Sequence, residues 1–223
     1  MVLHHRALLE LETRWLGRVP YREALALQLE THARVLAGDL PHTLLLLEHP
    51  PVYTMGKRGG FEFLLRSEEE LLGAGAEVVP TDRGGLVTFH GPGQLVGYPI
   101  LNLGALGGGL SNYISLLLES LVAALWRVGL VATYSMERPG LWVGERKLGA
   151  VGVRLKERVT YHGFAINVAT DLRWFDHIVA CGLQDVTTTS LVREMDSAPS
   201  VQEMGRLASD ELAARLGLVA TAR

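Results

Sequence analysis

The candidate catalytic groups of this chain are its single cysteine, Cys181, and Lys147, a lysine inside a glycine-containing apolar segment. An apolar site disfavours the ammonium form of a lysine, which lowers its pKa and suits it to proton transfer. A cysteine followed by glycine at a bend can present its sulfur to a cleft, and it becomes nucleophilic only when a neighbour stabilises the thiolate. The alternatives are a lysine that reaches water from a sheet edge and a cysteine that is merely buried.

A second chemical stretch, residues 83–100, reads RGGLVTFHGPGQLVGYPI. Two β-type runs, residues 86–89 and 95–98, flank the connector HGPGQ, where Gly and Pro force a turn. One interpretation is a β-hairpin with an unusual turn. The other is a wall that lines a ligand site, because Arg83, His90 and several glycines interrupt an apolar segment. A later β-type run, residues 161–168, likewise places His162 among apolar residues.

Other site chemistries find little support in the residue spacing. Four histidines, His49, His90, His162 and His177, have no short metal-ligand spacing, so we expect no metal site. The chain lacks a Gly-x-Ser-x-Gly elbow, and residues 57–60, KRGG, lack the spacing of a phosphate-binding loop.

Composition indicates a globular protein. The chain has 223 residues, of which 48% are hydrophobic and 20% charged, with a formal net charge of −3. This charge argues against nucleic-acid binding, and no apolar run reaches the roughly 20 residues that span a membrane. No secretory signal pattern is evident near the N-terminus, so we predict a cytoplasmic protein. One cysteine excludes an intrachain disulfide.

Periodicity in the first half of the chain predicts a strand over residues 9–14 and then a helix between Pro20 and Gly38. We expect the apolar face of this helix to consist of Leu25, Leu29, Ala33 and Leu36. Residues 43–47 read as a buried strand. A capping box formed by Ser67 and Glu70 predicts a short helix, and residues 77–79 predict a strand.

The second half begins with a long helix, expected to be capped by Ser111 and to end near Val128 before Gly129. Its expected apolar face is formed by Ile114, Leu117, Leu118, Leu121, Leu125 and Val128. Further strands are predicted over residues 130–134, 141–143, 148–155 and 159–168, with residues 187–189 as a short additional strand. A last helix is capped by Ser200 with Glu203. Clustered strands favour one α+β domain over residues 1–223, a mixed β-sheet flanked by helices.

Four ordered motifs, together with residues 48–56, EHPPVYTMG, resemble the lipoyl(octanoyl) transferases. The motifs are RGGLVTFHGPGQLVGYPI, then residues 146–152, RKLGAVG, residues 162–168, HGFAINV, and Cys181-Gly182 with residues 189–191, TSL. The resemblance implies the fold of the biotin and lipoate protein ligase catalytic domains. It also implies transfer of octanoyl from octanoyl-acyl carrier protein to a lysine of lipoyl domains, those of 2-oxoacid dehydrogenases and of the glycine cleavage H protein. Neither a cofactor nor ATP is implied.

By this resemblance, Cys181 matches the nucleophile that carries octanoyl as a thioester, and Lys147 matches the lysine paired with it. The matching acyl-site residues are Arg83, Gly84, Gly85, Leu86, Val87, Thr88, Phe89, His90, Ala150, Val151, Gly152, His162, Gly163, Phe164 and Ala165. The chain departs from the family where Ala180 replaces a common proline and Phe89 replaces a tyrosine.

Three alternatives remain open at this point. An ATP-dependent lipoate or biotin ligase of the same fold would activate a free acid and need no cysteine. A lipoyl amidotransferase would take its acyl group from another lipoyl-bearing protein. A carrier-binding module without catalysis would leave Cys181 buried and inert.

Overall fold

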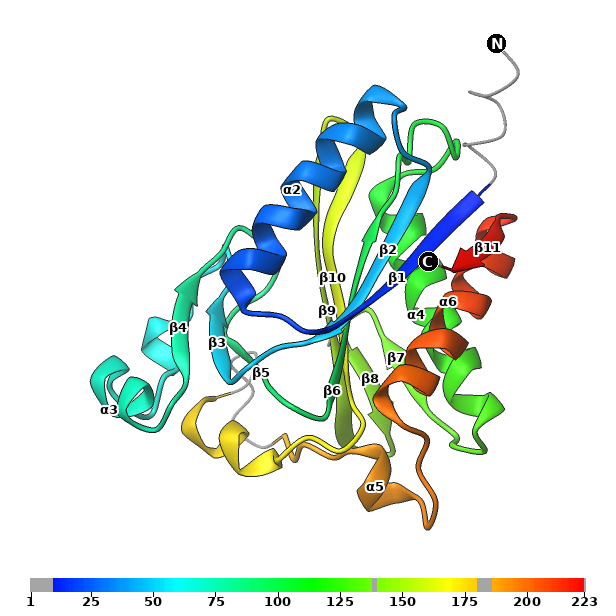
Figure 1. Cartoon of the computed structure of the whole chain (residues 1–223). Helices are drawn as coiled ribbons and strands as arrows, with labels where there is room; N and C mark the ends of the chain where they lie inside the picture. Colours follow the sequence, from blue (N-terminus) through cyan, green and yellow to red (C-terminus); the bar gives the residue numbers. More distant parts are fainter. Residues whose placement is uncertain (1–9, 138–139, 180–185, 223) are drawn as a thin grey trace.

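Two β-sheets organise the computed structural model, which describes residues 10–137, 140–179 and 186–222 (Figure 1). The large sheet has eight strands in the order β11-β1-β2-β6-β10-β9-β8-β7. Its strands are β1 (Glu10–Arg18), β2 (His42–Glu48), β6 (Gln94–Ile100), β7 (Thr133–Ser135), β8 (Gly140–Val143), β9 (Arg146–Lys156), β10 (Val159–Asn167) and β11 (Val219–Ala222). The pairs β11–β1 and β1–β2 are parallel and the others antiparallel, so the predicted mixed sheet is confirmed.

The small sheet consists of β4 (Glu77–Pro80), β3 (Val52–Met55) and β5 (Thr88–His90), in that order. The hairpin interpretation of residues 83–100 is therefore wrong. Its first strand, β5, pairs with β3, whereas its second, β6, pairs with β2 and β10 of the large sheet. The HGPGQ connector leads the chain from one sheet to the other, and local turn residues alone do not reveal which partner a strand takes.

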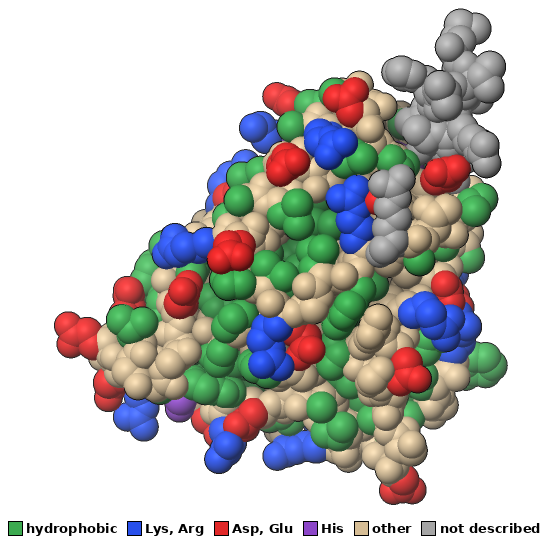
Figure 2. All heavy atoms as spheres, viewed as in Figure 1, with side chains coloured by type: hydrophobic (Ala, Val, Ile, Leu, Met, Phe, Trp, Pro, Cys, Tyr) green, Lys and Arg blue, Asp and Glu red, His purple; other side chains and the backbone are tan. Residues whose placement is uncertain are grey.

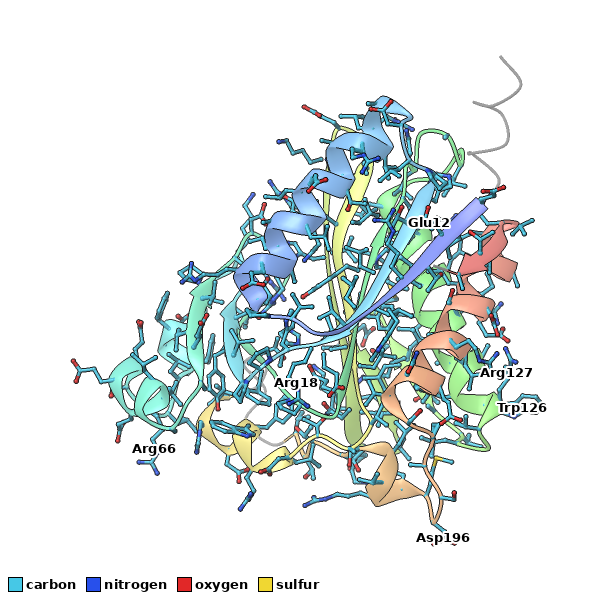
Figure 3. All side chains as sticks on the ribbon, in the orientation of Figure 1. Glu12, Arg18, Arg66, Trp126, Arg127 and Asp196 are labelled. Carbon is cyan, nitrogen blue, oxygen red and sulfur yellow. The ribbon has the colours of Figure 1, made fainter. Side chains whose placement is uncertain are left out.

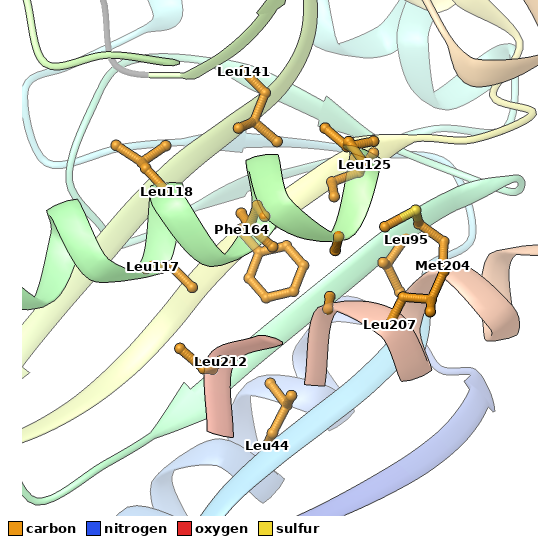
Figure 4. Close-up of a cluster of buried hydrophobic side chains, with 14 of the residues drawn as sticks. Leu44, Leu95, Leu117, Leu118, Leu125, Leu141, Phe164, Met204, Leu207 and Leu212 are labelled. Carbon is orange, nitrogen blue, oxygen red and sulfur yellow. The ribbon is translucent and has the colours of Figure 1, made fainter. Parts of the chain in front are cut away.

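Helices cover both faces of the large sheet (Figure 1). On one face lie α4 (Leu110–Arg127) and α6 (Val201–Leu216), and on the other lies α2 (Tyr21–Ala37). The main core fills the space between the sheet and the pair α4 and α6, with Phe164 of β10 near its centre (Figure 4). Shorter elements are α3 (Glu68–Gly73), α5 (Leu191–Glu194) and the 3-10 helices η1 (Phe61–Phe63) and η2 (Leu172–His177).

The bounds of α2 match the prediction, with Pro20 at its N-cap and Gly38 in the left-handed conformation at its C-cap. The predicted apolar face is wrong except at Leu25, which is half-buried against Tyr21, Val52 and Val79. Leu29 and Leu36 are 46% and 39% exposed, and Ala33 is exposed as well. The face that is buried instead consists of Tyr21, Ala24, Gln28, Thr31, His32 and Val35.

Polar residues on this buried face explain the error. Gln28 Oε1 accepts the backbone N–H of His162, and His32 Nε2–H donates to the carbonyl oxygen of Lys156. These bonds join α2 to β9 and β10 of the large sheet. A hydrophobic periodicity does not detect a helix face that is buried through hydrogen bonds.

The long helix α4 begins two residues earlier than predicted, with Gly109 instead of Ser111 at the N-cap position. Most of its predicted apolar face is buried, although Ile114 and Val128 are only half-buried. Trp126 extends outward from this helix and is 73% exposed (Figure 3). Both predicted capping boxes, at Ser67 and at Ser200, are confirmed. Within the described ranges, no helix is long and apolar enough to cross a bilayer.

Candidate active site

A pocket of about 390 Å³ lies where the loop before β5 meets β9 and β10. Its lining contains most of the residues that sequence analysis selected. These are Arg83, Gly84, Gly85, Leu86, Thr88, His90, Lys147, Ala150, Val151, Gly152, His162, Gly163, Phe164 and Ala165. The 83–90 segment thus meets the neighbouring strands β9 and β10 around one space, whose size is typical of small-molecule sites.

Val87 and Phe89 do not line this pocket, contrary to the expectation for residues 83–90. Both are fully buried in the core of the small sheet, where the Phe89 ring stacks on Trp174 at 5.4 Å. Successive side chains of an extended segment point to opposite sides. Leu86, Thr88 and His90 therefore face the pocket, while the residues between them face the core.

Cys181 lies outside the described residues, as does Ala180. Hydrogen bonds fix the chain before this segment to η1 and the chain after it to β9. Val179 N–H donates to the carbonyl oxygen of Phe63 at 2.9 Å. Lys147 N–H donates to the Thr187 carbonyl at 2.8 Å, and Thr189 N–H donates to the Lys147 carbonyl at 2.9 Å. The predicted strand over residues 187–189 is thus a single parallel bridge between Lys147 and Thr188.

Lys147 itself is only 6% exposed at the start of β9. Its ammonium lies 5.6 Å from the centre of the Trp142 ring, an arrangement that favours a cation over the aromatic face. Gly140, with a φ of 156°, allows this approach, because a Cβ there would lie 3.0 Å from Lys147 Cε. The lysine is therefore held in place by packing.

The loop that begins at Arg83 is fixed by the buried guanidinium. Arg83 donates to the side-chain and carbonyl oxygens of Thr54 at 2.5–3.1 Å and to the carbonyl oxygen of Gly84 at 3.0 Å. The loop then crosses β9 at Gly152, where a Cβ would lie 2.8 Å from the Gly84 carbonyl oxygen. Close backbone packing therefore explains the glycine at this position of the strand.

His162 belongs to a polar cluster at Asp82. Its Nε2–H donates to Asp82 Oδ1 at 2.8 Å, and the Tyr161 hydroxyl donates to the other carboxylate oxygen. Burial lowers the pKa of His162 below its ordinary value, and the neighbouring carboxylate opposes this effect only in part. The backbone at His162 has a φ of 54°, an unusual conformation for a side-chain-bearing residue.

His90 is held by a chain of side-chain amides. His90 Nδ1 is 2.7 Å from Gln94 Oε1, and Gln94 Nε2 donates to the Phe89 carbonyl at 3.2 Å and to Asn167 Oδ1 at 2.8 Å. Asn167 Nδ2 donates in turn to the Thr189 carbonyl at 3.0 Å. Burial lowers the pKa of His90 to about 3, so the ring is neutral.

The pocket also has lining residues that sequence analysis did not select, namely Tyr21, Arg58, Val96, Tyr98, Ile114, Met136, Glu137 and Val153. Val96 and Tyr98 lie in the stretch 83–100, and strand alternation places them on one side of β6. Tyr21 and Ile114 come from helices, where only tertiary packing decides which residue reaches the site. Among the residues described, no cluster of three or more His, Cys, Asp or Glu side chains could hold a metal ion.

Comparison with known proteins assigns the family. Residues 20–213 match the model of the lipoyl protein ligase A/B catalytic domain. An octanoyltransferase of Maridesulfovibrio salexigens is 43% identical over 88% of this chain and 92% of its own. The mitochondrial octanoyltransferase LIP2 of Arabidopsis thaliana is 44% identical over 87% of this chain and 83% of its own.

Solved structures agree at the level of the fold. A lipoate-protein ligase A bound with ATP superposes with a TM-score of 0.79, at 16% identity, over 96% of this chain and 88% of its own. The biotin protein ligase of Aquifex aeolicus gives a TM-score of 0.53, at 14% identity, over 92% of this chain and 68% of its own. The predicted α+β architecture of these ligase catalytic domains is confirmed, and the chain belongs to the octanoyltransferases of the lipoyl protein ligase A/B catalytic-domain family.

Proposed function

We propose that this protein moves octanoyl from octanoyl-acyl carrier protein to a lysine of a lipoyl domain, through a thioester on Cys181. The supporting observation is the position of Lys147. It lines the pocket, and its backbone is bonded to Thr187 and Thr189, shortly after Cys181 in the chain. A lysine next to a thiol stabilises the thiolate and, once deprotonated, can exchange a proton with an attacking group.

The pocket supplies a site for the acyl chain. Leu86, Ala150, Val151, Phe164 and Ala165 offer apolar surface, and the glycines between them leave room for a chain to lie along the strands. Burying methylene groups of the acyl chain contributes roughly 0.8 kcal/mol each. Backbone N–H groups of residues 150–152 and 163–165 are our candidates for binding the thioester carbonyl oxygen.

The energetics need no ATP. Transfer of octanoyl from the carrier thioester to Cys181 exchanges one thioester for another. Attack of the lysine amine then forms an amide and releases the thiol, which is favourable. We propose as acceptors the lipoyl domains of 2-oxoacid dehydrogenases and the glycine cleavage H protein. We further propose that residues 1–223 act as one catalytic domain in the cytoplasm, whose reducing conditions keep a lone thiol free.

Intact-mass measurement after incubation with octanoyl-acyl carrier protein tests the proposal. We expect an octanoyl adduct that hydroxylamine removes, and Cys181→Ser should lose both the adduct and transfer, by at least about 10³-fold. Lys147→Ala should slow adduct formation, since the thiolate loses its stabilising neighbour.

Controls separate the alternatives. ATP with free octanoate should give no product; ATP-dependent product would instead support a ligase. An octanoylated lipoyl domain offered as donor should compete poorly with the carrier protein, whereas efficient use of it would indicate an amidotransferase. Retention of the adduct by Cys181→Ser would show that the nucleophile is misassigned.

A further inference from the structure

The hydrogen bonds made by the side-chain amides of Gln94 and Asn167 next to His90 have fixed donors and acceptors. Asn167 Nδ2 donates to a carbonyl oxygen, so Asn167 Oδ1 faces Gln94. Gln94 Nε2 donates both to this oxygen and to the Phe89 carbonyl, so its own oxygen faces His90. An amide oxygen only accepts hydrogen bonds. His90 Nδ1 must therefore carry the proton, and the neutral ring has an unprotonated Nε2.

His90 Nε2 is the ring nitrogen that this hydrogen-bond network leaves available to a ligand in the pocket. His90 lines the pocket, and Nε2 neither hydrogen-bonds to any described residue nor appears among the nitrogens sealed from solvent. The adjacent His49 does not compete for it. His49 Nδ1–H donates to the Val19 carbonyl and His49 Nε2 accepts from the Tyr98 hydroxyl, so both its nitrogens are engaged.

The hydrogen-bond network of Asn167, Gln94 and His90 also reaches the end of the pocket where Lys147 lies. Gln94, Asn167 and Lys147 together border a second, water-sized cavity of about 20 Å³. Asn167 bonds to Thr189, whose N–H donates to the carbonyl of Lys147. The orientation of His90 and the position of Lys147 are thus set by one connected network.

We propose that His90 Nε2 accepts a hydrogen bond from the acceptor lysine's amine, and that Gln94 and Asn167 are positioning residues that enforce the required tautomer. This inference rests on the proposed function. Thioester carbonyl and sulfur atoms are acceptors, so an unprotonated Nε2 cannot bind them. Of the reacting groups that the two substrates bring to the pocket, the acceptor amine alone has an N–H to donate.

The hydrogen bond from the acceptor amine to His90 Nε2 assists only the second half-reaction, in which octanoyl passes from the acyl-enzyme to the lysine. With one N–H held by Nε2, the amine is held in the pocket in one orientation, which favours attack of its lone pair on the thioester carbonyl carbon. The C–N bond forms, the C–S bond breaks, and the proton lost by the amine protonates the leaving thiolate, so atoms and charge balance. No such contact is made while the enzyme takes octanoyl from its donor.

Gln94→Leu keeps the shape of the side chain and removes the acceptor for His90 Nδ1–H. The two half-reactions are measured separately: acylation by octanoyl-acyl carrier protein, and octanoyl transfer from the preformed acyl-enzyme to a lipoyl domain. We expect the transfer rate to fall about 10- to 100-fold, the range found for partners that orient metal-binding histidines. The fold-decrease in the acylation rate should be at least ten times smaller than the fold-decrease in the transfer rate. Long-range ¹H–¹⁵N spectra of the histidines should show His90 change from the Nδ1–H to the Nε2–H tautomer.

Gln94→Glu keeps an acceptor for His90 Nδ1–H, since a carboxylate oxygen also accepts, but it loses both hydrogen bonds that Gln94 Nε2 donates. At about pH 8.5, where imidazole stays neutral, it should restore the Nδ1–H tautomer and recover part of the transfer rate lost in Gln94→Leu. Parallel loss of both half-reactions, or an unchanged tautomer in Gln94→Leu, would overturn the inference. Failure of the wild type to form any acyl-enzyme would instead refute the proposed function, so the two outcomes are distinguishable.

Discussion

Individual residues at this site are fixed by directional contacts more than by their chemical type. Arg83 shows this most clearly, because its Nε and both terminal nitrogens donate to Thr54 or Gly84. A lysine has the charge but not the planar set of donors. The guanidinium therefore acts first as the anchor of the loop over the pocket.

Arg83→Lys should lower the free energy of unfolding by about 2 kcal/mol, since buried bonds to a charged donor are lost. Urea denaturation measures this change. Arg173→Lys is the matched control: its side chain is 86% exposed and pairs with Asp171 at the surface, so we expect a change within about 0.5 kcal/mol. Equal effects of the two substitutions would show that the Thr54 contacts contribute little.

At the scale of elements, α2 and the 83–100 stretch illustrate the limits of local patterns. The bounds of α2 follow from Pro20 and Gly38, but its orientation follows from Gln28 and His32, which bond to the sheet. Similarly, β5 and β6 look like a hairpin and join different sheets. Local residue types specify where an element begins and ends, and partners distant in sequence specify what it packs against.

Two substitutions on α2 test the corrected orientation. Val35→Ala, at a 4% exposed position facing the sheet, should cost about 2 kcal/mol through lost burial and the cavity that remains. Leu29→Ala, at a 46% exposed position, should change stability by less than about 0.5 kcal/mol. Thermal or urea unfolding compares them directly, and the reverse order would support the original leucine face.

Across the whole molecule, charge is distributed without a dominant patch of one sign on the face seen in Figure 2, while several histidines are buried inside. Burial lowers the pKa of His42 and His49 to about 4 and that of His90 to about 3. In the unfolded chain these groups titrate near pH 6.5. Between these values the unfolded chain binds more protons than the folded one, so falling pH favours unfolding.

The free energy of unfolding should therefore decrease as pH falls from about 6.5 towards 4. The slope should approach about 1.4 kcal/mol per pH unit for each buried histidine. Urea unfolding at a series of pH values checks this, and His42→Gln, which cannot titrate, should give a slope shallower by one histidine's share. A wild-type stability that stays constant between pH 6.5 and 5 would contradict the burial of neutral histidines.

The sequence by itself determined the α+β class, the capping boxes, most element bounds and the segments that surround the pocket. These features depend on local residue types and on spacing within one segment, which a sequence displays directly. Only the tertiary structure decided that Val87 and Phe89 face a core, that Tyr21 and Ile114 reach the pocket, and that the 83–100 stretch divides between two sheets. The tautomer of His90 belongs with these, because it is set by Gln94, Asn167 and Thr189, whose hydrogen bonds form only once β5, β6 and β10 lie together.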